Sequence, residues 1–220
     1  MKKEKEVYIH VGLPKTGTSW LQQNLFPNLN VHLIRKRKEF VNIPSKGKIL
    51  ISSESLSGSY SRSVDYRNFL AYGMKTVYPD AKIIVGLREK KSWLKSMYNQ
   101  GVKRGVFEES FEKWNNNLDP RILDFDSYIK KLNELFDNVF VYWFEDFKKD
   151  KKKVIEDMCR FLDVDVPIYD DSRINPSYYG IYEKFFLFYN KLLSSLRLSI
   201  ITFFKFLEGT KKYWRKRFGK

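Results

Sequence analysis

Residues 12–20, GLPKTGTSW, decide the fold, because they have the features of a phosphate-binding loop between a strand and a helix. The loop of nucleotide-hydrolysing proteins follows the pattern G-x-x-x-x-G-K-[ST], and Gly12 and Gly17 have the glycine spacing of that pattern. The lysine is displaced, however, since Thr18 follows the second glycine and Lys15 lies inside the loop. The sequence therefore predicts an anion site that has its cation in an unusual place.

Two interpretations of the loop are open. In the first, the backbone N–H groups of the turn and the positive end of the helix dipole bind a diphosphate-like group, and the two glycines allow a close approach. In the second, the segment is an ordinary strand–turn–helix connection that happens to contain glycine and proline. One lysine, two threonines and a serine lie between and after the glycines, and they favour the anion site.

The composition predicts one folded domain with a basic appendage. The chain has 220 residues, of which 43% are hydrophobic and 17% aromatic, and this excludes a disordered protein. Cys159 is the only cysteine and cannot form an internal disulfide, which fits a reducing compartment. The net charge is +15, and residues 181–220 hold ten Lys or Arg against two acids. Such an excess predicts attraction to a nucleotide, a polyanion, a nucleic acid or a membrane.

Neither a secretory signal nor a membrane-spanning helix is expected. Residues 1–17 are basic but lack the apolar core of a signal peptide, and no stretch offers about eighteen uninterrupted apolar residues. We therefore expect a cytoplasmic protein. Residues 185–218 mix Phe, Leu and Ile with spaced Lys and Arg. They either lie on the anionic inner face of the membrane, pack on the domain or on a second copy, or bind a polyanion. The oligomeric state stays open.

Segments with the apolar pattern of a strand alternate along the chain with segments that have the pattern of a helix. This order predicts an α/β fold of the P-loop type, with three layers in which helices flank a central parallel sheet. The expected strands are 6–12, 46–55, 80–89 and 138–146. The expected helices are 18–26, 64–79, 90–105, 126–136 and 148–164. We expect the α/β domain to cover residues 1–180 and a basic, aromatic helical tail to cover residues 181–220. Ligands of such sheets bind at the carboxyl ends of the strands.

The residues at these strand ends argue against a magnesium-dependent phosphotransferase. Kinase and hydrolase loops hold magnesium with a loop Ser or Thr and with an acid at the end of a nearby strand. The strand 80–89 reaches Arg88 instead of an aspartate, and only Asp146 could serve as the acid. A sulfuryl group carries less charge than a phosphoryl group, so the sequence favours sulfuryl transfer without a metal.

The segment PKTGTSWL, residues 14–21, resembles the loop of sulfotransferases that use 3'-phosphoadenosine 5'-phosphosulfate (PAPS), and the pattern is most similar to bacterial and carbohydrate sulfotransferases. The resemblance extends over about residues 6–180. The loop residues that it implies for the 5'-phosphosulfate are Pro14, Lys15, Thr16, Gly17, Thr18, Ser19 and Trp20. A second family element is an Arg at a strand end with a Ser eight residues later. Arg88 and Ser96 match it, which implies that they bind the 3'-phosphate.

The resemblance also implies the reaction, which is attack of an acceptor hydroxyl or amine on the sulfur of PAPS. Adenosine 3',5'-bisphosphate (PAP) leaves, and the family role of Lys15 is to meet the bridging oxygen on which charge grows. Carbohydrate sulfotransferases have a Glu after the strand that corresponds to 46–55, so Glu54 is the expected base. A salt bridge or a helix cap is its alternative role. Of the two histidines, His10 is expected to pack within its strand, and His32 has no motif around it.

Two further residues complete the expected nucleotide site. Trp20 is a candidate for stacking on adenine, because an aromatic face accepts any base, and a place in the core under the first helix is the alternative. The segment DSRINPSYYG, residues 171–180, resembles a stretch that closes over the nucleotide in related bacterial enzymes. This resemblance implies a role for Arg173 in binding the nucleotide.

The acceptor is expected to be a carbohydrate or a glycolipid, since Glu54 fits the carbohydrate enzymes and the many aromatic residues suit sugar faces. Two other classes of function are kept as alternatives. One is a P-loop nucleotide kinase or other phosphotransferase, which strict magnesium dependence would favour. The other is a non-catalytic polyanion-binding protein, which only the net charge supports. No nucleic-acid-binding motif is visible, so no nucleic-acid partner is expected.

Overall fold

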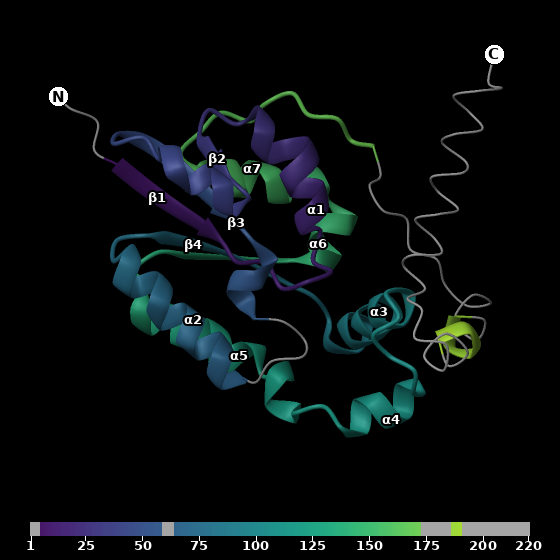
Figure 1. Ribbon diagram of the computed structural model, residues 1–220. Coiled ribbons are helices and arrows are strands. Elements are labelled where there is room, and N and C mark those ends of the chain that lie inside the picture. The colour runs from purple at the N-terminus through teal and green to yellow at the C-terminus, as the bar shows by residue number, and fades with distance from the viewer. Residues whose placement is uncertain (1–4, 59–63, 173–185, 191–220) are drawn as a thin grey trace, which may run out of the picture. The chain divides into compact units, whose positions relative to one another are not determined.

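The computed structural model of the protein describes residues 5–58, 64–172 and 186–190 (Figure 1). The chain forms two compact units, and each is built from two segments of the sequence. The first unit is Met1–Trp93 with Asp119–Asn175, and the second is Leu94–Leu118 with Pro176–Lys220. The described residues 186–190 thus belong to the same unit as the segment 94–118. Arg173 and most of the expected tail, including 191–218, lie outside the described residues.

The first unit is built on a five-stranded sheet in which every neighbouring pair is parallel. The strands are β1 (Lys5–His10), β2 (His32–Ile34), β3 (Gly47–Ser52), β4 (Lys82–Leu87) and β5 (Val139–Trp143). Their order is β2-β3-β1-β4-β5. The predicted parallel α/β fold is confirmed. The prediction of four strands was incomplete, because β2 has only three residues and is too short to show an apolar period.

Helices cover both faces of this sheet, which explains why its central strands are apolar on both sides. In Figure 1, α2 (Val64–Val77) and α5 (Phe125–Leu135) lie on one face, while α1 (Thr18–Trp20), α6 (Phe144–Lys149) and α7 (Lys151–Leu162) lie on the other. A buried cluster joins the second group of helices to β1, β3, β4 and β5. It includes Tyr8, Leu21, Leu25, Leu50, Ile84, Tyr142, Ile155, Met158 and Leu162.

Two predicted helices differ in detail from the structure. The expected helix 148–164 is divided at Asp150, whose side chain accepts a hydrogen bond from the Lys153 N–H and so starts α7 as an N-cap. The expected helix 18–26 begins as α1 but continues as a π-helical segment, η1 (Leu21–Leu25). It ends in a 3-10 turn, η2 (Phe26–Asn28), where Pro27 has no N–H for a longer helix.

Two further 3-10 segments adjoin the carboxyl ends of β2 and β3, and a third precedes α5. They are η3 (Arg37–Asn42), η4 (Glu54–Ser57) and η5 (Pro120–Leu123). The segment η4 starts two residues after the end of β3 and carries Glu54, the expected base, at its first position.

The second unit has an aromatic core of its own. The helix α3 (Lys90–Lys103) enters this unit after Trp93, and α4 (Phe111–Asn116), which was not predicted, follows it. The rings of Tyr98, Phe107, Phe111 and Trp114 pack with centroid distances of 5.3 to 6.0 Å. The helix α4 was missed because it has only six residues, and its start depends on the Ser110 side chain, which accepts from the Lys113 N–H.

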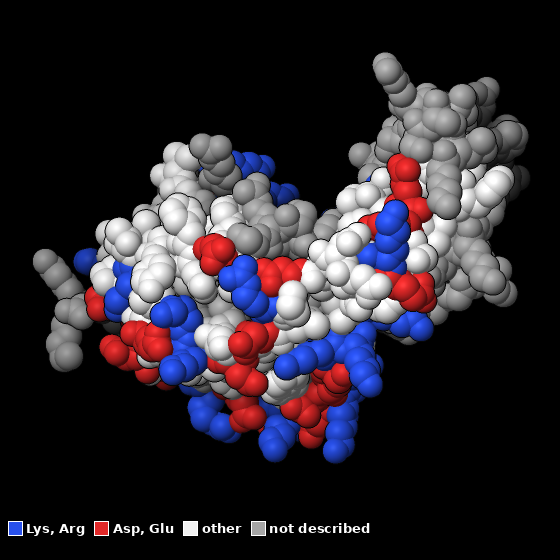
Figure 2. Space-filling view, turned by 90° about the horizontal axis from the view of Figure 1, so that it is seen from below, with Lys and Arg blue, Asp and Glu red and all other residues white. Residues whose placement is uncertain are grey.

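The surface over α2 and α5 carries charges of both signs. Figure 2 views the molecule from that side, and Lys and Arg side chains are interspersed there with Asp and Glu. The basic excess therefore does not gather into one patch on this face. Among the residues that the structure describes, no helix is long and apolar enough to cross a bilayer.

Candidate active site

The predicted loop leaves β1 at His10 and enters α1 at Thr18. Two of its residues have a left-handed backbone conformation, Lys15 with φ of 70° and Gly17 with φ of 91°. Glycine adopts such a conformation without strain, whereas a lysine does so at a cost. A left-handed lysine backbone persists only where surrounding contacts hold it in place.

Those contacts come from side chains that bind the loop carbonyls one by one. The donor–acceptor pairs are Ser57 Oγ to Gly12 O (3.4 Å), Thr16 Oγ1 to Leu13 O (2.6 Å), Trp93 Nε1 to Pro14 O (2.9 Å), Arg88 Nη1 to Lys15 O (3.1 Å) and Tyr142 Oη to Thr16 O (3.2 Å). Five consecutive carbonyls thus accept a hydrogen bond from a side chain. The donors come from η4, the end of β4, α3, β5 and the loop itself.

This arrangement sets the direction of the loop N–H groups. In a planar trans peptide the N–H points opposite to the C=O of the preceding residue. The N–H groups of Lys15, Thr16 and Gly17 therefore point away from the side chains that hold the carbonyls. Successive N–H groups of a turn that point to one side can form a concavity that binds anions. The structure thus supports the anion-site interpretation over an ordinary connection.

Two further observations fit an oxyanion at this concavity. A Cβ on Gly12 would lie 2.8 Å from both His10 Nε2 and Thr18 Oγ1, so only glycine fits at this position. The hydroxyl of Thr18 is buried and has no hydrogen-bond partner among the residues that the structure describes. A buried hydroxyl without a partner costs about 1–3 kcal/mol. A phosphate or sulfate oxygen would remove that cost, so the residues present fit the 5' end of PAPS.

Arg88 lies against the loop at the end of β4, and only 7% of it is exposed. Besides Lys15 O, its guanidinium contacts the Ser92 hydroxyl (Nε to Oγ, 2.9 Å), the Glu145 carboxylate (4.0 Å) and the ring of Phe144 (4.7 Å to the centroid). A guanidinium has five N–H donors, and two of them donate to protein atoms in the described part of the chain. Ser96, its expected companion, lies on α3 in the second unit and is buried.

Glu54 lies at the same edge of the sheet as the loop. The pairing of His10 with Ser52 aligns the ends of β1 and β3, and the Ser53 N–H donates to the His10 carbonyl at 3.1 Å. The charge of Glu54 also acts on Tyr142. The pKa of Tyr142 is raised, mainly by burial; the charge of Glu54 adds to this rise, and the hydrogen bond to Thr16 opposes it. Ser53 is the N-cap of η4 and makes no side-chain cap hydrogen bond. Glu54 follows it in the first turn.

His10 packs within its strand, as predicted, and has no exposed surface. Its ring nitrogens are 2.8 Å from the Ser52 hydroxyl and 3.2 Å from the Tyr142 hydroxyl. Burial lowers the pKa of His10 to about 3, so the ring is neutral at physiological pH. Both nitrogens are engaged inside the protein, so His10 is not placed to take a proton from an acceptor.

Trp20 belongs to the buried cluster, with 7% of its surface exposed. The ring packs edge-on with Phe147 (5.3 Å) and Tyr169 (5.7 Å), and Lys151 Nζ lies 4.5 Å from its centroid. The indole N–H donates to the Ser172 carbonyl at 3.0 Å. These contacts favour a role in the core, because they leave little of the indole for a base. Pro14 and Ser19 are half-buried in the loop and in α1.

Sequence reasoning missed three residues that hold the loop, namely Ser57, Trp93 and Tyr142. No local signal marks them, because each lies far from the loop in the sequence and meets it only in the fold. A fourth residue beside the loop, Gly86, was also missed, although the sequence carried a signal for it. A glycine inside an apolar strand often marks a close approach of other atoms, and a Cβ on Gly86 would lie 2.7 Å from Thr16 Oγ1.

Comparisons with known proteins show the family of the chain and its fold. Residues 6–176 match the family described as the sulfotransferase domain, while no curated protein matches the chain. A sulfotransferase from Alicyclobacillus acidocaldarius is similar in structure, with 21% identity, a TM-score of 0.58, and coverage of 80% of this chain and 87% of that one. Mouse sulfotransferase SULT7A1, complexed with PAP, has 17% identity, a TM-score of 0.51, and coverage of 76% of this chain and 62% of that one.

The two solved structures confirm the expected α/β fold, since at these identities a likeness carries the fold alone. The family match covers more than three quarters of the chain and includes the loop, Glu54 and Arg88. Enzymes of this family use PAPS as the sulfuryl donor. The chain is therefore an enzyme that transfers sulfuryl groups, and it belongs to the sulfotransferase family.

Proposed function

We propose that this enzyme moves the sulfuryl group of PAPS to a hydroxyl of a carbohydrate or glycolipid acceptor, with the loop 12–18 as the donor site. The observation that carries this proposal is the row of five loop carbonyls held by side chains. In this proposal, the row turns the N–H groups of Lys15, Thr16 and Gly17 toward the ligand before it arrives. Such preorganisation is the main source of electrostatic stabilisation in enzymes.

The donor contacts can be assigned by residue. The N–H groups of residues 15–17 and the Thr18 hydroxyl bind the 5'-phosphosulfate, with Pro14 and Ser19 at the two ends of the loop. The hydroxyl of Thr16 is used within the loop, by Leu13 O, so Thr16 contributes its N–H. The remaining N–H donors of Arg88, together with Ser96, bind the 3'-phosphate. Arg173 completes the nucleotide site as a proposed contact to the phosphate, whereas the contacts of Trp20 with Phe147 and Tyr169 favour a place in the core.

Lys15 and Glu54 carry the chemistry in this proposal. Bound PAPS supplies an activated sulfuryl group whose bond to the bridging oxygen breaks as the acceptor oxygen bonds to sulfur. Lys15 places an ammonium beside the bridging oxygen, which receives the electron pair of the broken bond. Glu54 takes the proton of the acceptor hydroxyl. No metal is needed, since Lys15 and the loop N–H groups meet the developing charge.

The acceptor class is supported by Glu54, which follows the carboxyl end of β3, where ligands of such sheets bind and where a base for an acceptor hydroxyl is needed.

For the C-terminal tail, the described residues support packing on its own chain. The Asn190 side chain donates to the carbonyls of Val102 (2.8 Å) and Phe107 (3.1 Å) within the second unit. A peripheral contact with anionic lipid at the inner face of the membrane remains a proposal for residues beyond 190. A truncation after residue 190 tests it, because loss of cosedimentation with anionic liposomes supports membrane contact and equal pelleting refutes it.

A thermal-shift panel with PAP, ATP plus magnesium, and AMP tests the donor site. A ligand at about a hundred times its dissociation constant adds roughly 2.7 kcal/mol of stability, which for a chain of this size is a shift of about 5–10 °C. We expect PAP to stabilise the protein without metal. Stabilisation by ATP with magnesium alone would instead favour a phosphotransferase.

A matched pair of variants ties the shift to the loop. Thr18→Val keeps the shape of the side chain but removes the hydroxyl that has no partner among the described residues. We expect this variant to lose part of the shift with PAP. Thr76→Val, on α2, removes a hydroxyl that bonds the Tyr72 carbonyl, and it should keep the full shift. An equal shift in both variants would contradict the assignment of Thr18.

A further inference from the structure

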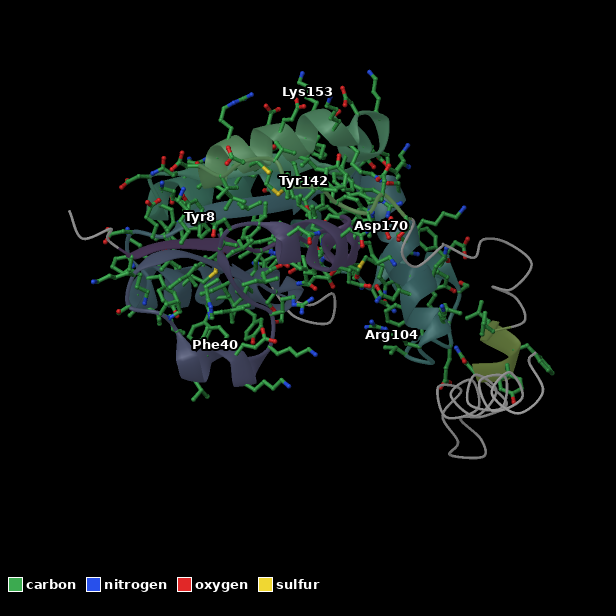
Figure 3. All side chains as sticks on the ribbon, turned by 90° about the horizontal axis from the view of Figure 1, so that it is seen from above. Tyr8, Phe40, Arg104, Tyr142, Lys153 and Asp170 are labelled. Carbon is green, nitrogen blue, oxygen red and sulfur yellow. The ribbon has the colours of Figure 1, made fainter. Side chains whose placement is uncertain are left out.

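A buried chain of hydrogen bonds runs beneath the loop, from η1 to the loop backbone. Its links are Gln22 Nε2 to Ser52 Oγ (3.0 Å), Ser52 Oγ to His10 Nδ1 (2.8 Å), His10 Nε2 to Tyr142 Oη (3.2 Å) and Tyr142 Oη to Thr16 O (3.2 Å). The residues come from η1, β3, β1, β5 and the loop. In Figure 3, Tyr142 lies among the buried side chains, whereas Lys153 on α7 points outward.

The chemistry of the groups fixes the direction of every bond in this chain. The Thr16 carbonyl only accepts, so the single proton of the Tyr142 hydroxyl is donated to it. The Tyr142 oxygen must then accept a proton from His10 Nε2. Neutral imidazole has one N–H, so Nδ1 is an acceptor and takes the proton of the Ser52 hydroxyl. The Gln22 amide closes the chain by donating to Ser52. Only the Nε2–H tautomer of neutral His10 satisfies all four bonds.

The two ends of the chain lie beside the two groups that carry the proposed chemistry. Thr16 follows Lys15 directly in the loop. Ser52 ends β3 two residues before Glu54, and the backbone of His10 holds the intervening residue through the bond from the Ser53 N–H (3.1 Å). One buried ring thus contacts the strand end that bears the base through Ser52 and reaches the donor loop through the hydroxyl of Tyr142.

We propose that His10 is a positioning residue, which as the Nε2–H tautomer sets the loop of Lys15 against the strand end of Glu54. This inference rests on the roles proposed above for these two residues and deepens them. His10 touches neither substrate and acts through Tyr142 and Ser52. A misplacement of about 1 Å in a reacting group costs on the order of a hundredfold in rate, so a bond that fixes the loop affects turnover more than ligand affinity.

The alternative is that His10 only fills space, since its ring also packs edge-on with Phe26 at 5.2 Å. The tautomer distinguishes the two. The chain has only two histidines, His10 and His32, so nitrogen NMR of 15N-histidine-labelled protein gives two rings, and His10→Gln identifies them. We expect His10 to carry its proton on Nε2, with no titration between pH 5 and 8. A proton on Nδ1, exchange between the tautomers, or titration in that range overturns the proposal.

Kinetics of Tyr142→Phe test the consequence for catalysis. The variant keeps the ring but removes the hydroxyl between His10 and Thr16. We expect kcat to fall by about ten- to a hundredfold, while the KM for PAPS and the dissociation constant for PAP change by less than about threefold. Tyr128→Phe is the matched control, because it removes another buried tyrosine hydroxyl, on α5, and should leave kcat unchanged. Equal kcat for Tyr142→Phe and the wild type, or a loss confined to KM, overturns the proposal.

Rescue by a conservative variant separates positioning from folding. In His10→Gln the amide can still donate to Tyr142, whereas in His10→Leu no bond remains. We expect kcat to decrease from wild type to His10→Gln to His10→Leu, with PAP-binding thermal shifts present in all three. Failure of the wild type to bind PAP would refute the proposed function, while the tautomer would still be measurable. Binding and transfer by the wild type, with no ordering among the variants, would refute this inference alone.

Discussion

The hydroxyl of Tyr142 occupies the space that a side chain on Gly86 would need. A Cβ on Gly86 would lie 2.4 Å from Tyr142 Oη, closer than such atoms approach in proteins. The missing side chain on β4 lets a tyrosine from the neighbouring strand β5 reach the Thr16 carbonyl at 3.2 Å. A glycine in one strand and a tyrosine in the next therefore shape the donor loop together, although neither belongs to it.

Gly86→Ala should accordingly distort the donor loop, although Gly86 itself lies outside the loop. The added methyl group displaces Tyr142 or Thr16, and overpacking of this kind costs about 1–3 kcal/mol of unfolding free energy. We expect PAP affinity to fall as well, measured by calorimetry. Gly73→Ala is the control, since a Cβ there meets nothing within 4 Å and alanine stabilises a helix by up to about 1 kcal/mol. Similar behaviour of the two variants would refute the steric argument.

Lys15→Ala should abolish most transfer while leaving PAP binding partly intact. The amine is assigned to the oxygen that gains charge in the transition state, and loss of one such group costs about 10²–10³ in kcat. Alanine keeps the Cβ, so the left-handed backbone at φ of 70° is as strained as with lysine. Steady-state kinetics and PAP calorimetry measure the two effects. Lys152→Ala, on the exposed side of α7, is the control, and turnover of Lys15→Ala at the wild-type rate would remove the assigned role.

Glu54→Gln should lower the transfer rate by roughly a hundredfold or more, because the amide cannot take a proton from the acceptor. The substitution keeps the size of the side chain, so PAP binding should change little. Initial rates at saturating and limiting acceptor separate a loss in kcat from a loss in affinity. A loss in acceptor affinity alone would make Glu54 a binding residue, and Glu156→Gln on α7 controls for the change in charge.

Stability should fall below about pH 6.5 because of His10. Burial holds its folded-state pKa near 3, while the unfolded chain titrates near 6.5. Between these values the unfolded state binds the extra proton, so the free energy of unfolding falls by up to about 1.4 kcal/mol for each unit that the pH decreases. From pH 7.5 to 5.5 the expected loss is about 1.4 kcal/mol. Urea titrations should show this loss in the wild type and lack it in His10→Gln; a parallel loss in both would assign it elsewhere.

Much of the first unit could be predicted from the sequence. The strands β3, β4 and β5 lie within the expected segments, because runs of apolar residues covered on both faces are visible without the fold. The short strand β2 and the short helix α4 were not predicted, since three and six residues give no period to detect. The break at Asp150 was also missed, because an aspartate in a lysine-rich helix has the same local appearance as an N-cap between two helices.

The residues of the candidate site also differ in whether the sequence reveals them. The loop 12–18 and the arginine at the end of β4 could be found from spacing and strand ends. The row of carbonyl acceptors could not, because its donors are up to 126 residues from the loop and are ordinary Ser, Trp and Tyr side chains. For Trp20, the position in the motif suggested adenine stacking, whereas its contacts with Phe147 and Tyr169 favour a place in the core.

Asn190 provides a test of where the start of the C-terminal tail belongs. Only 4% of it is exposed, and its amide donates to the carbonyls of Val102 and Phe107 in the second unit. Asn190→Ala leaves both carbonyls without this donor, and a lost partner of a buried polar group costs about 1–3 kcal/mol. Phe188→Ala is the control, because Phe188 is 67% exposed and should change the unfolding free energy by no more than about 0.5 kcal/mol. Urea unfolding followed by tryptophan fluorescence measures the loss, and Trp114 is one of the tryptophans that lie in this unit. If Asn190→Ala is as stable as Phe188→Ala, the segment does not anchor the tail, and a partner or a membrane becomes the better explanation for its apolar residues.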